Sequence, residues 1–172
     1  MLLEIVKYPD PRLAKKCAEV AEVTPRLRAL IEDMVETMYE KDGVGLAAPQ
    51  VGHNIRLITV DDTGPKERKA QRILVKPESV EGEGVKESEE SCLSVPAFST
   101  KIKRKETVTV KAQDENGQDV RIRAEGLLAV ILQHEIDHLD GKVFVDHAGR
   151  LKRALYDKKI AKWRKNREQA QA

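Results

Sequence analysis

Apolar residues recur every three or four positions in the segment that follows Thr24 and Pro25. That spacing is typical of one buried helix face. Thr24 is a favoured N-cap, Pro25 suits the first helical position, and Gly43 is a stop signal. The pattern therefore predicts a helix over about 25–42. Its apolar face would consist of Leu27, Leu30, Ile31, Met34, Val35 and Met38.

Strand signals follow this helix. The runs "IRLITVD" (55–61) and "RILVK" (72–76) are short and apolar, with the polar loop "DTGPKERKAQ" between them. Polar and apolar residues later alternate on both sides of Asn116-Gly117, which is a strong hairpin signal. The preceding "GVGLAAPQVG" is too rich in glycine and small residues for a regular helix.

A second, strongly apolar helix is predicted for "EGLLAVILQHEIDHLDG", with Gly141 closing it. A third helix would start near Gly149 or Arg150 and run toward the C-terminus. The expected fold class is α+β. Short antiparallel strands would pack around the central apolar helix, with further helices in the N-terminal and C-terminal parts.

Composition indicates one cytoplasmic domain. The 172 residues suffice for a single core, and with 40% hydrophobic but 3% aromatic residues that core must be mainly aliphatic. The net charge of +2 gives no sign that the whole chain binds DNA. No apolar run is long enough to predict a membrane span, and the N-terminus lacks signal-peptide features. Two cysteines cannot form a disulfide framework, so we expect a reducing compartment.

The central helix carries a candidate metal site. "HEIDH" places His134 and His138 four residues apart, and about 100° of turn per residue brings both imidazoles to one helix face. Glu135 lies beside them, as in HExxH metalloenzymes in which the glutamate is the general base. The alternative is that the two histidines only cap a buried helix.

A catalytic metal site needs a third protein ligand. Downstream, the position that would complete the metzincin pattern is Phe144, which cannot bind a metal. Asp157 and Glu168 lie among Lys and Arg residues typical of a solvated helix, and His147 is a weak candidate.

The upstream candidate is better. Cys92 lies in the polar segment "EESCLSVP", and a thiolate is a strong ligand for zinc or ferrous iron. Cys17, in "KKCAEV", is interpreted as a small buried hydrophobe. Three ligands from two segments would leave one coordination position open, as in hydrolytic sites.

Three motifs together carry a family resemblance. "GVGLAAPQ" (43–50), "ESCLS" (90–94) and "QHEIDHLDG" (133–141) have the order and spacing of peptide deformylases. The chain resembles this family over roughly residues 3–146, with Ser91 and Ala97 departing from positions where glycine is common. The resemblance implies a bacterial-type, metal-dependent hydrolase. Such enzymes remove the formyl group from the N-terminal formylmethionine of nascent polypeptides.

The resemblance also implies roles for individual residues. Glu135 would be the general base, and Gln50 with the backbone N–H of Leu93 would stabilise the oxyanion. The family favours Fe²⁺ as the metal, although Zn²⁺ or another divalent ion would suit the same ligands. Those ligands would be Cys92, His134 and His138.

Further residues are candidates for substrate contacts. Gly43 and Gly45 would let the substrate backbone approach closely, or would serve only the geometry of the turn. Val130 and Ile131 share the helix face of the first histidine. With Val44 opposite, they would wall a pocket for the methionine side chain, unless they belong simply to the core.

Two other function classes fit the metal motif. One is a non-catalytic binding module stabilised by its metal, and the other is a peptidase that cleaves internal bonds. A structural site is usually closed by four protein ligands, whereas only three are convincing here. Turnover of formylmethionyl peptides, compared with unformylated ones, would separate the three functions.

The C-terminal segment is basic. From 150 to 167 the chain has nine Lys and Arg residues against the single acid Asp157. We expect residues 1–148 to form the catalytic part and 149–172 a basic helix of the same domain. A positive helix suits ribosomal RNA. The resemblance implies the same partner, because some bacterial deformylases dock a C-terminal helix near the nascent-chain exit.

The alternative for this segment is a solvated helix that only packs on the body. Leu151, Leu155 and Trp163 would then make the apolar contacts. Because the tail holds no proposed ligand or base, truncation after Ala148 would leave hydrolysis of a short peptide nearly unchanged.

Overall fold

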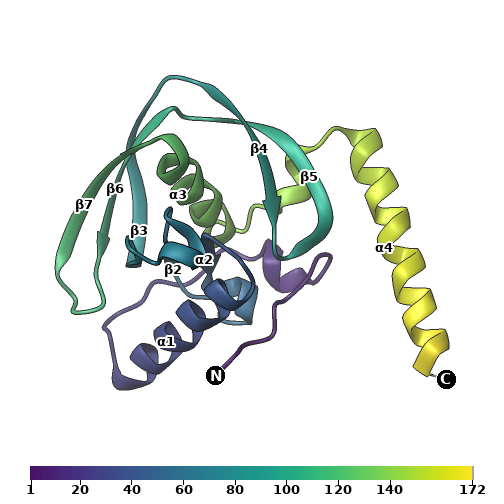
Figure 1. Ribbon diagram of the computed structural model, residues 1–172, viewed down its shortest axis with the longest axis horizontal. Helices are drawn as coiled ribbons and strands as arrows, with labels where there is room; N and C mark the ends of the chain where they lie inside the picture. Colours follow the sequence, from purple (N-terminus) through teal and green to yellow (C-terminus); the bar gives the residue numbers. More distant parts are fainter. Residues whose placement is uncertain (172) are drawn as a thin grey trace.

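The computed structural model describes residues 1–171 and has the expected α+β fold (Figure 1). The α-helices are α1 (Pro25–Glu40), α2 (Gly64–Glu67), α3 (Gly126–Leu139) and α4 (Arg150–Gln171). The strands are β1 (Gly45–Ala47), β2 (Leu57–Val60), β3 (Arg72–Glu83), β4 (Lys86–Cys92), β5 (Val95–Arg104), β6 (Thr107–Gln113) and β7 (Asp119–Glu125). The 3₁₀ turns are η1 (Pro11–Ala14), η2 (Ala48–Val51) and η3 (Phe144–His147).

The central helix α3 lies between two antiparallel sheets. The larger sheet has the strand order β1-β2-β3-β6-β7, and β4 and β5 form a separate ribbon. Figure 1 shows β3, β6 and β7 on one side of α3 and the β4–β5 ribbon on the other. This arrangement brings the end of β4 close to the helix that carries the two histidines.

The first helix follows the sequence signals. Thr24 Oγ1 accepts a hydrogen bond from the N–H of Leu27 at 3.1 Å, and Pro25 is the first helical residue. The helix ends at Glu40, slightly before the predicted end, and the chain turns through Asp42 with a φ of +56°. Its apolar face packs against β1, β2 and β3. The predicted helix is therefore confirmed.

Strand β2 is buried on both faces. Leu57 packs in the cluster that contains α1, whereas Ile58 and Val60 pack in the cluster that contains α3. Because side chains alternate along a strand, this strand separates two apolar layers. The double burial explains why its sequence is mainly apolar, with Thr59 as its one polar residue. It also makes α3 an interior helix, in which Leu132 and Leu139 have no exposed surface.

The middle of the chain was predicted incompletely. β3 continues to Glu83, and β4 and β5 were missed, as was the one-turn α2 within the predicted polar loop. Residues 78–83 of β3 are exposed and lack the apolar alternation of a half-buried strand. In β5, Ile102 and Arg104 both point inward, and a buried arginine hides the alternation. The β6–β7 hairpin around Asn116-Gly117 is confirmed.

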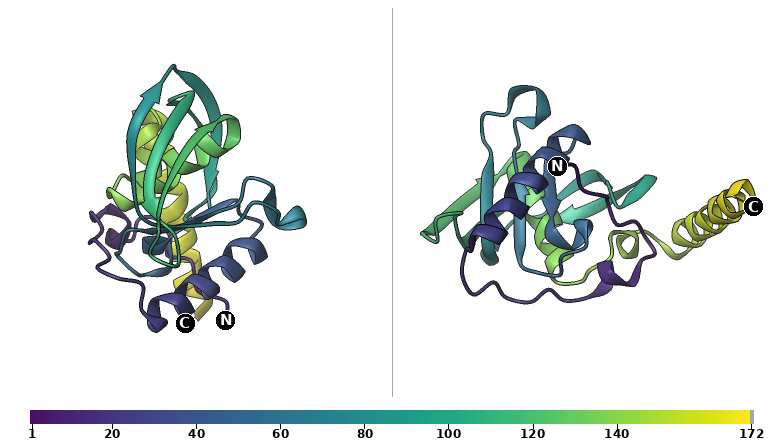
Figure 2. Two further views of the ribbon diagram at one scale, coloured as in Figure 1. Left: turned by 90° about the vertical axis from the view of Figure 1, so that its left-hand side faces the viewer. Right: turned by 90° about the horizontal axis from the view of Figure 1, so that it is seen from below.

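The last helix projects from the body (Figures 1 and 2). Its buried residues are Tyr156 and Ile160. They belong to a cluster with residues of β5 and η3, namely Val95, Phe98, Ile102, Phe144 and Val145. None of the helices in residues 1–171 is long and apolar enough to cross a membrane.

The expected packing of this helix through Leu151 and Leu155 was wrong. These side chains are 75% and 59% exposed. The two leucines lie roughly 100–180° around the helix from Tyr156 and Ile160. The leucine pair and the buried pair therefore cannot face the body together. Trp163, 37% exposed, lies along a groove between α4 and the N-terminal segment.

Truncation after Ala148 should destabilise the protein, because it removes Tyr156 and Ile160 from the apolar cluster that they form with β5 and η3. Each such burial contributes about 1.5–3 kcal/mol, so the melting temperature should fall by roughly 10 °C. The sequence predicted nearly unchanged hydrolysis of a short peptide after this truncation, and the packing of α4 adds an expected loss of stability.

Truncation after Trp163 is the matched control. It removes basic residues but keeps both buried side chains, and it should melt within about 2 °C of the full chain. Equal melting temperatures for the two truncated chains would contradict the packing role of the helix.

Candidate metal centre and active site

Two segments bring three metal-ligating side chains together. α3 supplies His134 and His138, and the end of β4 supplies Cys92. One potential ligand atom from each lies within 4.8 Å of the others, and Cys92 Sγ is 3.3 Å from His138 Nε2. Both histidines are buried and Cys92 is half-buried. The predicted trio is thus assembled by long-range packing of β4 against α3.

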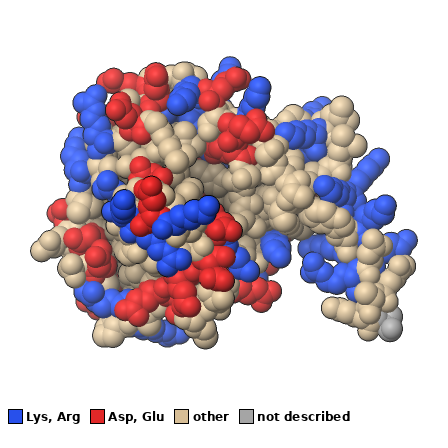
Figure 3. Space-filling view, viewed as in Figure 1, with Lys and Arg blue, Asp and Glu red and all other residues tan. Residues whose placement is uncertain are grey.

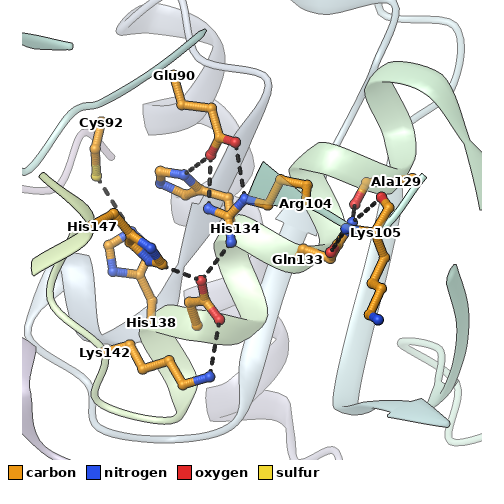
Figure 4. Close-up of polar contacts among 11 residues, drawn as sticks. Glu90, Cys92, Arg104, Lys105, Ala129, Gln133, His134, His138, Lys142 and His147 are labelled. Atoms are coloured by element: carbon orange, nitrogen blue, oxygen red, sulfur yellow. Dashed lines mark hydrogen bonds and ion pairs between the residues drawn. The ribbon is translucent and has the colours of Figure 1, made fainter. Parts of the chain in front are cut away.

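Glu90 orients one of these histidines (Figure 4). Its Oε1 lies 3.0 Å from His134 Nδ1, an arrangement that leaves Nε2 for a metal. Arg104 donates two hydrogen bonds to the same carboxylate, at 2.9 and 2.8 Å. Burial alone would raise the pKa of Glu90, but these partners lower it to about 2. Glu90 therefore remains an anion behind the ligand.

Asp137 extends this network to the surface. Arg104 donates to its Oδ2 at 2.6 Å, and His147 Nε2 lies 3.4 Å from the same oxygen. His147, the weak ligand candidate, thus pairs with a carboxylate and is not part of the three-residue cluster. Figure 4 draws these contacts as dashed lines, with Arg104 and His147 labelled.

Glu135 is the least satisfied group of the site. It is 5% exposed, and its Oε2 has no hydrogen-bond partner among residues 1–171. Burial raises the pKa of its carboxyl to about 7. Buried polar atoms of this kind are rare and costly unless a ligand or water completes them.

Gly45 makes room for this carboxylate. A Cβ at position 45 would lie 2.7 Å from Glu135 Oε1 and 2.9 Å from Ile131 Cγ2. The neighbouring helix α3 therefore requires glycine at position 45. Neither close approach of the substrate nor turn geometry, the two interpretations from the sequence, includes this reason. At Gly43 a Cβ would meet Met38 O at 3.2 Å, which is a milder conflict.

Gln50 is held rigidly by its own turn. Its Oε1 accepts from the N–H of Ala47 at 2.9 Å. Its Nε2 donates to Ser94 Oγ at 3.1 Å and lies 3.5 Å from Cys92 Sγ. The side-chain amide thus points toward the cluster from η2, opposite α3.

These groups line a cleft of about 710 Å³. The sequence-predicted residues along it are Gly43, Val44, Gly45, Gln50, Cys92, Leu93, Val130, Ile131, His134 and Glu135. Val44 and Val130 are partly exposed, whereas Ile131 is buried. A second hollow of about 740 Å³ around Arg56 and Lys76 contains none of the three clustered side chains.

The cluster fits a divalent metal. One thiolate and two imidazoles match zinc or ferrous iron, and fewer than four protein ligands is typical of catalytic sites. Burial lowers the pKa of His138 well below its ordinary value, which favours the neutral form that binds metal. Burial acts in the same direction on His134, but hydrogen bonds with Cys92 and Glu90 raise its pKa well above the usual value. A metal cation bound at the cluster would repel the proton on the His134 imidazole and favour the neutral form.

Comparison with known proteins identifies the family. The polypeptide deformylase model matches residues 2–154. A peptide deformylase from Thermodesulfovibrio yellowstonii is 51% identical over 159 residues, covering 92% of this chain and 96% of the relative. The chain belongs to the polypeptide deformylase family. Its activity is peptide deformylation, the metal-dependent removal of the formyl group from nascent peptides.

Solved deformylase structures share the whole fold. The enzyme from Legionella pneumophila is 45% identical, with a TM-score of 0.90 over 100% of this chain and 99% of that one. A deformylase from Ehrlichia chaffeensis in complex with actinonin is 37% identical, with a TM-score of 0.87 over 94% and 96% of the two chains. Family membership decides against both a non-catalytic binding module and a peptidase of internal bonds.

The two departures from the family motifs have different consequences. Ser91 is exposed at the edge of the deformylase cleft. Ala97 has a φ of +57°, a left-handed conformation that glycine adopts without strain. This conformation explains why glycine would be favoured there, and alanine must be held in place by its surroundings.

Gly45→Ala should lower deformylase turnover by about 10²-fold or more while leaving the metal content unchanged. The added Cβ collides with Glu135 and Ile131, and small misplacements of a reacting group have effects of that order. Turnover and metal content measured on the same preparation would check this.

Gly149→Ala is the control for this substitution, because a Cβ at Gly149 meets no atom within 4 Å among the described residues. It should keep turnover within about twofold of wild type. Full activity of the Gly45 variant would show that the fit to Glu135 is not required.

Proposed function

We propose that one ion, bound by the Cys-His-His cluster, and three further groups carry out deformylation of N-terminal formylmethionine. The groups are the carboxylate of Glu135, the side-chain amide of Gln50 and the backbone N–H of Leu93. The observation that carries this assignment is the buried Oε2 of Glu135 beside the cluster, which has no hydrogen-bond partner among the described residues. When bound, a divalent metal lowers the pKa of a water molecule and polarises an adjacent carbonyl oxygen.

Glu135 acts as the proton carrier. It takes a proton from the attacking water as the water oxygen bonds to the formyl carbon. It then gives that proton to the amide nitrogen as the C–N bond breaks, so that formate and a free amino terminus are released. Its place on α3, between the two histidines, supports both steps at one site.

Gln50 and Leu93 stabilise the oxyanion. The Gln50 amide is anchored through Ala47 and Ser94, so donation requires little reorganisation. Leu93 directly follows Cys92, and its N–H would approach the same oxygen. Losing one such donor typically lowers the rate by a factor of about 10² to 10³.

The methionine side chain binds along Val44, Val130 and Ile131, which are apolar residues of the cleft. Gly43 and Gly45 leave the backbone accessible to the peptide at the opposite wall. An apolar pocket with a few fixed polar groups is typical of a substrate site.

Glu135→Gln should lower turnover of a formylmethionyl peptide by about 10² to 10⁴-fold, because the proton carrier is lost and the ligands are kept. Metal content should match wild type, and an unformylated peptide should be unchanged by both proteins. A variant that retains more than a tenth of wild-type turnover would show that another group carries the proton.

Fe²⁺ is proposed as the resident metal on the basis of the family, since ligand softness suits Zn²⁺ equally. Protein purified without oxygen should contain about one iron atom per chain by elemental analysis. Zinc at that level, with iron absent, would contradict the assignment.

The ribosome is proposed as a partner in the cytoplasm. Figure 3 shows Lys and Arg side chains crowded on the projecting helix, away from the acidic residues of the body. The Lys and Arg residues of α4 are exposed. Such a surface suits RNA phosphates near the emerging nascent chain.

Ribosome binding is tested with the chain truncated after Trp163, because this variant keeps the packing residues. It should co-sediment with ribosomes less than the full chain at low salt, and added salt should weaken the full chain further. Equal co-sedimentation of both chains would argue against docking through the distal helix.

A further inference from the structure

The wall of the cleft contains an unusual interruption of the β4–β5 ribbon. Ser91 pairs with Ser99, but the next pair joins Cys92 to Val95. Pro96, Ala97 and Phe98 therefore form a bulge without partners on β4, and all three line the cleft. Bulges next to active sites commonly redirect the strand and its side chains.

The sequence of this bulge does not favour its conformation. Ala97 is held in the left-handed region, which costs a residue other than glycine some conformational energy. The backbone groups of Pro96, Ala97 and Phe98 also lose the hydrogen bonds that a regular β-ladder would supply. External contacts must therefore hold the segment.

α4 supplies those contacts. Tyr156 Oη donates to the carbonyl oxygen of Pro96 at 2.7 Å, and Lys152 Nζ donates to the carbonyl oxygen of Ser99. The Phe98 ring lies 4.8 Å from the Tyr156 ring and 5.2 Å from Lys152 Nζ. The helix thus binds the bulge at both ends and packs on its central aromatic residue.

We propose that α4 fixes this bulge in the shape that binds the peptide chain, so that Tyr156 and Lys152 are positioning residues for substrate. The inference rests on the proposed use of the cleft for the formylated peptide. Neither residue is in the metal cluster. Loss of either contact changes the wall of the cleft and leaves the reacting groups in place.

The effect is therefore expected in substrate binding. Tyr156→Phe keeps the ring but removes the hydrogen bond to Pro96, and it should raise KM about fivefold. The value of kcat and the metal content should match wild type. A series of formylmethionyl peptides of two to five residues should show a larger rise for the longer members, because these contact more of the wall. Lys152→Met should act in the same direction.

Tyr8→Phe is the matched control. The Tyr8 hydroxyl donates to Asp157 Oδ1 at 2.5 Å, so this variant also loses one tyrosine hydroxyl bound to the same helix. It makes no change at the bulge, and KM should remain that of wild type for every peptide. The sole tryptophan, Trp163, reports whether the helix stays on the body, and its acrylamide quenching should be equal in all variants.

Each other outcome overturns the inference. Unchanged KM in Tyr156→Phe and Lys152→Met would show that the bulge holds its shape without the helix. An equal rise in Tyr8→Phe, or increased quenching of Trp163, would assign the effect to general undocking. A fall in kcat together with lost metal would place it at the metal centre. Wild-type turnover, measured alongside, tests deformylation itself independently.

Discussion

The guanidinium of Arg104 joins the two segments that carry the ligand cluster. It donates two hydrogen bonds to Glu90, on the strand that leads to Cys92, and one to Asp137 on α3. Arg104 and Glu90 are both buried. Removing one member of such a buried set typically costs about 3–5 kcal/mol, because the remaining charges are left unpaired. The metal centre therefore depends on a cation that is not itself a ligand.

The parts of this deformylase that could be predicted are those whose signals are local. α1 has a cap, a proline and an apolar face within one segment, and the β6–β7 hairpin has Asn116-Gly117 between alternating strands. The clustered ligands were found because two histidines four apart on a helix have only one geometry. Cys92 was found by chemical elimination together with the family motifs.

The parts that were missed depend on contacts distant in sequence. Glu90 lies in a recognised motif, but its role requires Arg104, and Arg104 lies in a run of alternating Lys residues without apolar periodicity. The need for Gly45 becomes visible only when α3 brings Glu135 against β1. The contact face of α4 was predicted from its leucines, although the aromatic cluster of β5 and η3 selects Tyr156 and Ile160 instead.

The projection of α4 also separates two electrostatic tasks. α4 is buried against the body at Tyr156 and Ile160, and Arg167 lies about 10 Å beyond Ile160 along the helix axis. Ionic screening reduces interactions between exposed charges beyond about 8 Å at physiological ionic strength. The distal cations therefore neither repel a divalent ion entering the cleft nor disturb the proton affinity of Glu135. The protein can carry a strongly positive helix and a metal-binding centre in one small domain because ionic screening limits the range of the exposed distal charges.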